Sequence, residues 1–146
     1  MATFAGFTPG DTRTFLDTNI LVYGDDRGEP EKRERCLELI EMLRRKHTGV
    51  VSIQVLQEYF VTATRKFALD AAVAKSKVEV FARFHVVEPG VADVLAAIDL
   101  HRLTRISYWD ALIVRCAKQA GCRALLSEDM QHGQTIDGVR IVNPFL

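Results

Sequence analysis

Short apolar segments alternate with amphipathic helical segments along this 146-residue chain, and this alternation restricts the fold more than any other feature. Strands separated by helices pair in parallel through right-handed crossovers, which produces a sheet covered by helices. We therefore predict an α/β fold, a three-layer sandwich with a central, mainly parallel sheet flanked by helices. The predicted strands are residues 14–16, 49–52, 85–87, 124–126 and 139–142, and the predicted helices are residues 18–24, 31–47, 53–66, 70–84, 91–103 and 107–120.

Length and composition favour one globular domain. A chain of 146 residues can bury a substantial core but is too short for two independent ones. Residues 1–12 contain Gly6, Pro9 and Gly10 and show no periodicity, so we expect a loose leader before a single domain at residues 13–146. The sequence shows neither a secretion signal nor an apolar run of bilayer length, so we expect a soluble, cytoplasmic protein without a membrane segment.

The charge balance gives no global attraction to nucleic acid. Nineteen Lys and Arg residues offset nineteen Asp and Glu residues, so any polyanion must be bound locally. Residues 44–47 and 65–66 are the local basic candidates, although solvated helix ends explain them equally well. Cys36, Cys116 and Cys122 lie in apolar helical patterns without metal-site spacing, which predicts reduced, buried thiols.

Two acids follow predicted strands. Asp17 ends the apolar run 14–16, and Asp129 follows the run 124–126 after two residues, before what we expect to be the start of a helix. Asp17 alone is explained equally well as a helix N-cap. If both strands are central and parallel, however, their carboxyl ends point the same way, where ligands bind in open α/β sheets. We therefore expect Asp17 and Asp129 to face each other.

Asp110 lies in the segment Ser107-Tyr108-Trp109-Asp110, which matches the capping-box pattern [ST]-x-x-[DE]. That structural explanation is the simpler one. On a helical wheel, however, Asp110 lies at the edge of the apolar stripe rather than on the solvent face. The predicted core stripe of this helix consists of Trp109, Leu112, Ile113, Cys116, Ala117 and Ala120.

Glu58 falls nearly opposite the predicted apolar stripe of its helix and is most simply a surface residue. Surface acids usually have a basic residue three or four positions away, but those positions hold Gln54, Val55, Val61 and Thr62. Glu58 thus has no local ion-pair partner in the sequence. The predicted stripe of the helix consists of Ile53, Leu56, Tyr59, Phe60, Ala63 and Phe67.

Several carboxylates at close range cannot all stay ionised unless their pKa values rise or a cation binds. Oxygen ligands favour Mg²⁺ or Mn²⁺, and Mg²⁺ commonly completes its coordination with water and substrate phosphate. The chemistry expected of such a cluster is hydrolysis of a phosphodiester or phosphate ester.

Taken in chain order, Asp17-Thr18-Asn19, Glu58, Tyr108-Trp109-Asp110-Ala111 and Glu128-Asp129 resemble a PIN-domain ribonuclease, and most of all the VapC-type toxins of bacterial type II toxin–antitoxin pairs. The resemblance runs from about residue 14 to the end of the chain. It implies that Asp17, Glu58, Asp110 and Asp129 form an acidic, catalytic pocket that binds Mg²⁺ or Mn²⁺, with Thr18 and Asn19 orienting it.

The same resemblance implies a homodimer that cuts RNA endonucleolytically and is silenced by a cognate antitoxin protein. Residues 1–12 depart from the family, whose members usually begin at the first strand. Three alternatives remain open: an idle PIN-like module that binds RNA or protein, a housekeeping RNA-maturation nuclease, and a phosphatase with Asp17 as nucleophile. The common phosphatase pattern has a second Asp where this chain has Asn19.

Four other residues receive structural interpretations. Glu128 could assist Asp129, but an exposed acid in a turn is the simpler interpretation. His132 could act as a general base, but a loop histidine without a catalytic role is the simpler interpretation. Tyr108 and Trp109 are aromatic groups able to stack on bases, but we predict that Trp109 packs in the core.

Overall fold

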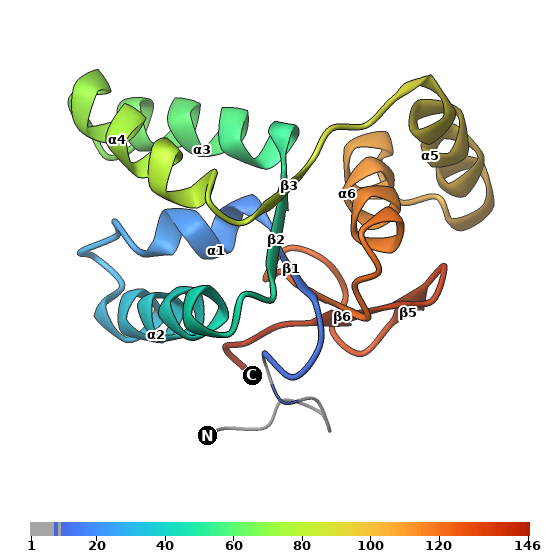
Figure 1. Cartoon of the computed structure of the whole chain (residues 1–146), viewed down its shortest axis with the longest axis horizontal. Coiled ribbons are helices and arrows are strands. Elements are labelled where there is room, and N and C mark those ends of the chain that lie inside the picture. The colour runs from blue at the N-terminus through green and yellow to red at the C-terminus, as the bar shows by residue number, and fades with distance from the viewer. Residues whose placement is uncertain (1–7, 9) are drawn as a thin grey trace.

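The predicted α/β sandwich is present in a computed structural model, which describes residue 8 and residues 10–146 (Figure 1). Most of the predicted leader, residues 1–12, lies outside the described residues. Six strands form one sheet in the order β3-β2-β1-β4-β6-β5. The strands are β1 (Thr14–Leu16), β2 (Gly49–Ser52), β3 (His85–Val87), β4 (Ala124–Leu126), β5 (Thr135–Ile136) and β6 (Val139–Val142).

The sheet is parallel except at one edge. β5 pairs antiparallel with β6, and every other pairing is parallel, so the prediction of a mainly parallel sheet is confirmed. β5 was not predicted because two residues are too few to show a strand pattern. The chain places β2 and β3 on one side of β1 and β4 on the other, so the strand order reverses between β1 and β4. Such a reversal is where open α/β sheets bind ligands.

The two central strands are held by burial on both faces. Phe15, Leu16, Leu125 and Leu126 have no exposed surface. Central parallel strands therefore read as continuous apolar runs rather than alternating ones. Each such side chain contributes about 1.5–3 kcal/mol to folding relative to an exposed position.

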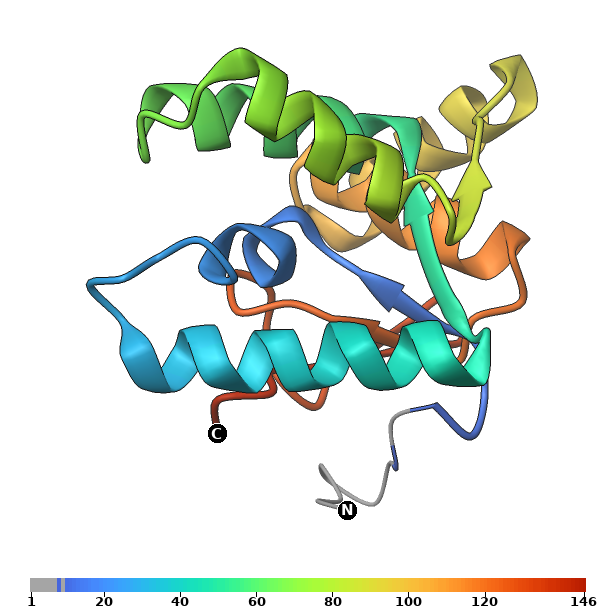
Figure 2. The same cartoon turned by 60° about the vertical axis from the view of Figure 1, so that its left-hand side comes forward.

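Helices cover both faces of the sheet, as crossover handedness requires. Figure 1 shows α1 to α4 on one face and α5 and α6 on the other. In Figure 2, β1 and β2 run in the same direction, and α1 and α3 begin where those strands end. The helices are α1 (Thr18–Tyr23), α2 (Pro30–Lys46), α3 (Ile53–Arg65), α4 (Ala71–Phe81), α5 (Val91–Thr104) and α6 (Tyr108–Gln119).

The apolar stripe predicted for α3 is partly wrong. Val55 is fully buried, whereas Ile53 and Phe60 are 36% and 37% exposed. The reason is that α3 packs against α1 and α4 as well as against the sheet, and the fully buried Tyr59 donates its O–H to Asp25 at 2.6 Å. Glu58 itself is exposed, but its carboxylate accepts a hydrogen bond from Thr18 at the start of α1, so Glu58 lies beside the packed side of α3 instead of opposing it.

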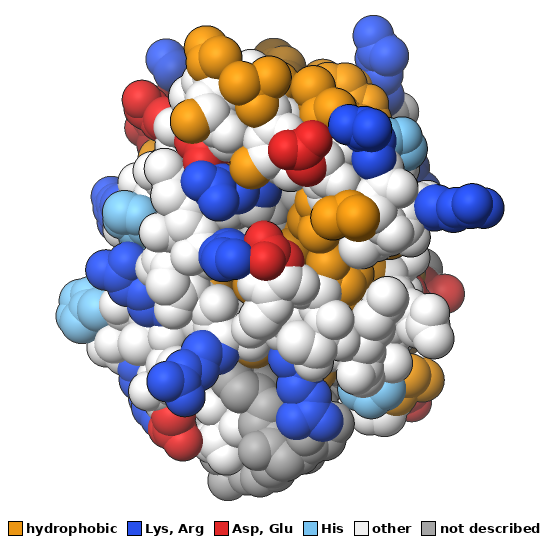
Figure 3. All heavy atoms as spheres, turned by 90° about the vertical axis from the view of Figure 1, so that its right-hand side faces the viewer, with side chains coloured by type: hydrophobic (Ala, Val, Ile, Leu, Met, Phe, Trp, Pro, Cys, Tyr) orange, Lys and Arg blue, Asp and Glu red, His pale blue; other side chains and the backbone are white. Residues whose placement is uncertain are grey.

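The prediction that Trp109 packs in the core is wrong, because its side chain is 61% exposed. Trp109 lies in the first turn of α6, and a helical wheel does not show that this turn extends beyond the core. Other large apolar side chains are also exposed on this side of the molecule, namely Val91, Leu95, Ile98 and Leu103 of α5. Figure 3 shows hydrophobic groups scattered among basic and acidic ones on this face.

Two further local predictions need correction. The segment after β4 forms bends, not a helix, so Asp129 lies in a loop. The helix predicted for residues 70–84 ends at Phe81, since the next residues turn into β3.

The three cysteines are free and buried, as predicted. In the part of the chain that is described, no helix has both the length and the apolar composition to cross a membrane.

His47 ends α2 in the left-handed conformation, with φ 56° and ψ 36°, and its side chain is exposed. An L-residue pays about 1–2 kcal/mol for this conformation, whereas glycine adopts it freely. We expect His47→Gly to raise the free energy of unfolding by about 0.5–1 kcal/mol, measured by urea denaturation. The control His47→Ala keeps the Cβ atom and should bring no gain. An equal gain in both variants would contradict the role of backbone strain.

Candidate active site

All four acids singled out in the sequence line one pocket at the carboxyl ends of β1 and β4. Its volume is about 350 Å³. The strand-order reversal between β1 and β4 accounts for its position. Its lining residues are Asp17, Thr18, Asn19, Val22, Tyr23, Asp26, Glu58, Thr62, Lys66, Phe67, Asp110, Glu128 and Asp129.

Asp17 lies at the centre of this arrangement and is only 8% exposed. Its backbone N–H continues the ladder from β1 to β4 by donating to the Leu126 carbonyl at 3.0 Å. Its Oδ1 accepts a hydrogen bond from the Thr18 N–H at 2.8 Å, which caps α1. Its Oδ2 accepts one from the Ser127 hydroxyl at 2.8 Å. The cap and the pocket position therefore coexist, with one oxygen for each.

Asn19 links the two strand ends. Its Nδ2 lies 3.2 Å from Asp129 Oδ2 and 3.4 Å from Asp17 Oδ2, so one amide donates to both carboxylates. Its Oδ1 accepts a hydrogen bond from the backbone N–H of Glu128 at 3.1 Å. Asn19 thereby fixes the loop after β4 relative to α1.

Glu58 reaches the pocket from α3. Thr18 Oγ1 donates to Glu58 Oε2 at 3.0 Å, and Gln54 Nε2 donates to Glu58 Oε1 at 2.6 Å. Gln54 is one turn earlier on the same helix and supplies the local partner that the sequence did not provide as a basic residue. The two hydrogen bonds hold the Glu58 carboxylate beside the start of α1.

Asp110 enters the pocket from the first turn of α6. Ser107 is the N-cap of this helix, and its hydroxyl accepts a hydrogen bond from the Asp110 N–H at 3.1 Å. The Ser107 half of the predicted capping box is therefore present, and the Asp110 side chain is half-buried, as its position at the edge of the stripe indicated. Unlike Asp17, Asp110 takes part in the cap through its backbone N–H, while its side chain lines the pocket.

Burial and mutual repulsion raise the pKa values of two of these acids. Desolvation raises the pKa of Asp17 to about 6, against the lowering effect of the hydrogen bonds from Ser127 and Thr18, and the charges of Asp110 and Glu58 add to the rise. The pKa of Asp110 is also raised, mainly by desolvation and then by the charges of Asp129 and Glu58, while a hydrogen bond with Ser107 lowers it. Negative charge in this pocket is therefore not fully compensated by the protein.

The donor set fits a hard divalent cation bound by few protein ligands. Within residue 8 and residues 10–146, no group of three or more Asp, Glu, His or Cys side chains is arranged so that it could hold a metal ion. Mg²⁺ commonly uses one or two carboxylates and completes its octahedron with water and phosphate oxygens. Asp17 and its neighbouring carboxylates supply oxygen donors of the right kind.

Ser127 is the functional candidate that sequence reasoning missed. It is fully buried, donates to Asp17, and accepts from the Asp129 N–H at 3.2 Å. The only signal in the sequence was its place directly after β4, equivalent to the place of Asp17 after β1. His132 accepts a hydrogen bond from the Asn143 N–H at its Nδ1, at 3.0 Å, and so anchors a loop.

Glu128 is not the exposed turn acid that was predicted. It is half-buried, forms an ion pair with Lys32 and accepts a hydrogen bond from the Tyr23 hydroxyl. These partners come from α2 and α1, about a hundred residues earlier in the chain, so only the tertiary structure reveals them.

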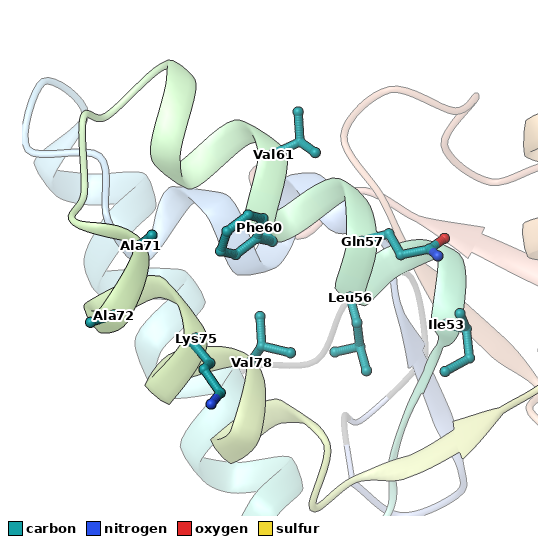
Figure 4. Close-up of a pocket in the computed structure, with 9 residues that line it drawn as sticks. All are labelled: Ile53, Leu56, Gln57, Phe60, Val61, Ala71, Ala72, Lys75 and Val78. Carbon is teal, nitrogen blue, oxygen red and sulfur yellow. The ribbon is translucent and has the colours of Figure 1, made fainter.

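A second hollow lies between α3 and α4 and differs in character (Figure 4). It has a volume of about 740 Å³ and contains no acid, and Gln57 and Lys75 are the polar residues among those that line it. Figure 4 shows Phe60 of α3 and Val78 of α4 in the space between the two helices. An apolar lining does not suit phosphodiester chemistry, so the acidic pocket remains the candidate active site.

Comparison with known families identifies the domain. The family model described as "PIN domain" matches residues 14–135. A comparison with curated protein sequences found no match to this chain.

Solved structures share the fold at low sequence identity. A toxin-antitoxin complex from Klebsiella pneumoniae matches with a TM-score of 0.66 and 17% identity, over 90% of this chain and 97% of the other. VapC20 of Mycobacterium tuberculosis, described as a sarcin-ricin loop cleaving toxin, matches with a TM-score of 0.64 and 19% identity, over 80% of this chain and 91% of the other. DNA-bound VapBC of Salmonella typhimurium matches with a TM-score of 0.65 and 20% identity, over 89% of this chain and 96% of the other.

Asp17→Asn should stabilise the metal-free protein at neutral pH. The raised pKa means that the folded state favours neutral Asp17, so ionisation costs stability as the pH rises from about 4 through about 6. A shift from 3.8 to about 6 corresponds to roughly 3 kcal/mol, since one pKa unit is about 1.4 kcal/mol. We expect a higher Tm for the variant at pH 7.5 and no difference near pH 3.5. A variant less stable than the original at pH 7.5 would contradict the burial penalty.

Ser127→Ala should raise the pKa of Asp17 further, because the Ser127 hydroxyl donates to the charged carboxylate. NMR titration of the Asp17 carboxyl carbon measures the change. Ser76→Ala is the control, since the Ser76 hydroxyl is exposed, donates to the Ala72 carbonyl within α4 and does not line the pocket. An unchanged Asp17 titration in Ser127→Ala would show that this hydrogen bond does not stabilise the ionised form.

Proposed function

This chain belongs to the PIN domain family, and from that premise and its acidic pocket we propose that it is a divalent-metal-dependent endoribonuclease, the toxin of a toxin–antitoxin pair. The observation that carries the proposal is the convergence of Asp17, Glu58, Asp110 and Asp129 on one pocket from four separate segments of the chain. Acids placed there for capping alone would have no reason to share a pocket.

The proposed cofactor is Mg²⁺ or Mn²⁺, held by Asp17 with Asp110, Asp129 or Glu58. When bound, such an ion lowers the pKa of water and offsets charge on a phosphoryl oxygen. The protein's part is to position the carboxylates: Ser127 and Asn19 hold Asp17 and Asp129, while Thr18 and Gln54 hold Glu58. The raised pKa of Asp17 supports the proposal because a cation would relieve the repulsion that contributes to it.

RNA is the proposed substrate. Lys66, from one of the two basic clusters noted in the sequence, lines the same pocket as the acids. A lysine beside carboxylates gives a phosphate group one attractive contact in a chain of zero net charge. VapC20, which has this fold, is named as a toxin that cleaves the sarcin-ricin loop, and this supports structured RNA as a substrate class.

The proposed partner is a cognate antitoxin protein. Similar structures include toxin–antitoxin assemblies from Klebsiella pneumoniae and Salmonella typhimurium. We also propose that the protein forms a homodimer and acts in the cytoplasm, where RNA and the antitoxin are both present.

A cleavage assay tests the activity. We expect the protein to cut RNA with Mg²⁺ or Mn²⁺, EDTA to stop cleavage, and Asp17→Asn to lower the rate by more than the roughly 10- to 100-fold that loss of an outer-shell partner costs a metal site. Asp99→Asn is the matched control, because Asp99 is an exposed acid of α5 that does not line the pocket.

Two outcomes would contradict the proposal. Undiminished cleavage of RNA by Asp17→Asn would show that the acidic pocket does not catalyse the reaction. Binding of RNA without turnover under either metal would instead favour an idle binding module.

A further inference from the structure

A polar cluster, two of whose three members line the pocket, joins three elements of the fold. We call it the Lys32 cluster; it comprises Lys32 of α2, Tyr23 at the end of α1 and Glu128 in the loop after β4. Lys32 Nζ forms an ion pair with Glu128 Oε1, and the Tyr23 hydroxyl donates to Glu128 Oε2. Both oxygens of the Glu128 carboxylate are therefore bound.

Aromatic rings hold Lys32 in place. Its Nζ lies 5.1 Å from the centre of the Tyr23 ring and 5.2 Å from that of Phe145. The two rings meet edge to face with their centres 5.2 Å apart. Cation–π contacts with both rings orient the ammonium group toward Glu128. The Lys32 and Glu128 side chains are 32% and 23% exposed, so water screens the pair less than it would a fully exposed one.

The cluster connects to Asp129 through the backbone of Glu128 and the side chain of Asn19. While the Glu128 side chain is bound by Lys32, its N–H donates to Asn19 Oδ1 at 3.1 Å. The other end of the Asn19 amide donates to Asp129 Oδ2 at 3.2 Å. A continuous set of contacts therefore runs from Lys32 through Glu128 and Asn19 to Asp129.

Asp129 needs such an anchor. It is exposed, it lies in a loop of bends, and its charge and that of Asp110 repel each other across the pocket. Repulsion between carboxylates favours movement of Asp129 away from the pocket. The ion pair of Glu128 with Lys32 opposes that movement at the neighbouring residue.

We propose that Lys32 is a positioning residue for the nuclease reaction, holding Asp129 in the pocket through Glu128 and Asn19. Tyr23 shares this role by binding the second oxygen of Glu128. The inference rests on the proposed function, because Lys32 is proposed to position one of the four acids of the nuclease site. Lys32 itself does not line the pocket, so it acts through other residues.

Kinetics of three variants test the proposal. Lys32→Met removes the charge and keeps most of the side-chain length, so we expect kcat to fall about 10- to 100-fold, as displaced catalytic groups do. The KM for RNA should stay within about twofold of the value for the original protein, because Lys32 is not expected to contact the bound RNA. Lys32→Arg should recover most of kcat by restoring the ion pair. Lys118→Met is the matched control: Lys118 pairs with Asp137 at 2.7 Å, away from the pocket.

Three kinetic results would overturn the role. They are an equal loss of kcat in Lys118→Met, a rise in KM without a fall in kcat, and a failure of Lys32→Arg to recover activity while its Tm matches that of the original protein.

A second measurement separates this inference from the proposed function. If the original protein cleaves no RNA, the endonuclease proposal fails, yet hydrogen exchange still reports on the loop. Lys32→Met should speed exchange of the Glu128 and Asp129 amides, whereas Lys118→Met should leave it unchanged. Equal exchange in Lys32→Met and the original protein would overturn the positioning role.

Discussion

The parallel pairing of β1 with β4 is the constraint on which the pocket depends. Leu16 lies opposite Leu126, so Asp17 and Ser127 leave the sheet side by side. The Asp17 N–H extends the same ladder by donating to the Leu126 carbonyl. A slip of one residue would turn every side chain of the strand to the other face and separate this pair. Apolar side chains buried on both faces hold the register, so the core of the sheet positions the chemistry at its edge.

Asp17 shows how one carboxylate serves folding and the pocket together. One oxygen caps α1 and the other accepts from Ser127. The cost is a buried charge whose pKa rises to about 6. Proteins keep such unfavourable charges mainly at functional sites, where activity matters more than maximal stability. A bound cation of the kind proposed would offset both the desolvation and the repulsion, so the same burial that destabilises the metal-free state favours a metal-bound one.

The corrections to α3 and α6 share one physical cause. A helical wheel assumes a single buried direction that is constant along the axis. α3 has neighbours on several sides, so Val55 is buried while Ile53 and Phe60 are exposed. α6 begins beyond the core, so Trp109 is exposed although it follows the apolar period. Because α1 is one of the neighbours of α3, the exposed Glu58 meets Thr18 at the start of α1.

The sequence by itself determined the alternation of strands and helices and the mainly parallel sheet, because periodicity is a local property, and strand-end position singled out Asp17 and Asp129. Glu58 and Asp110 had simpler structural explanations and joined the candidate site only through the resemblance to PIN-domain ribonucleases. The sequence did not reveal Ser127 as the partner of Asp17, the ion pair of Glu128 with Lys32, or the true face of α3. Those depend on which segments meet: 110 residues separate Ser127 from Asp17, and 96 separate Glu128 from Lys32. Only strand register and helix packing bring such residues into contact, because a hydrogen bond or an ion pair depends on distance in space and leaves no periodic trace in the chain.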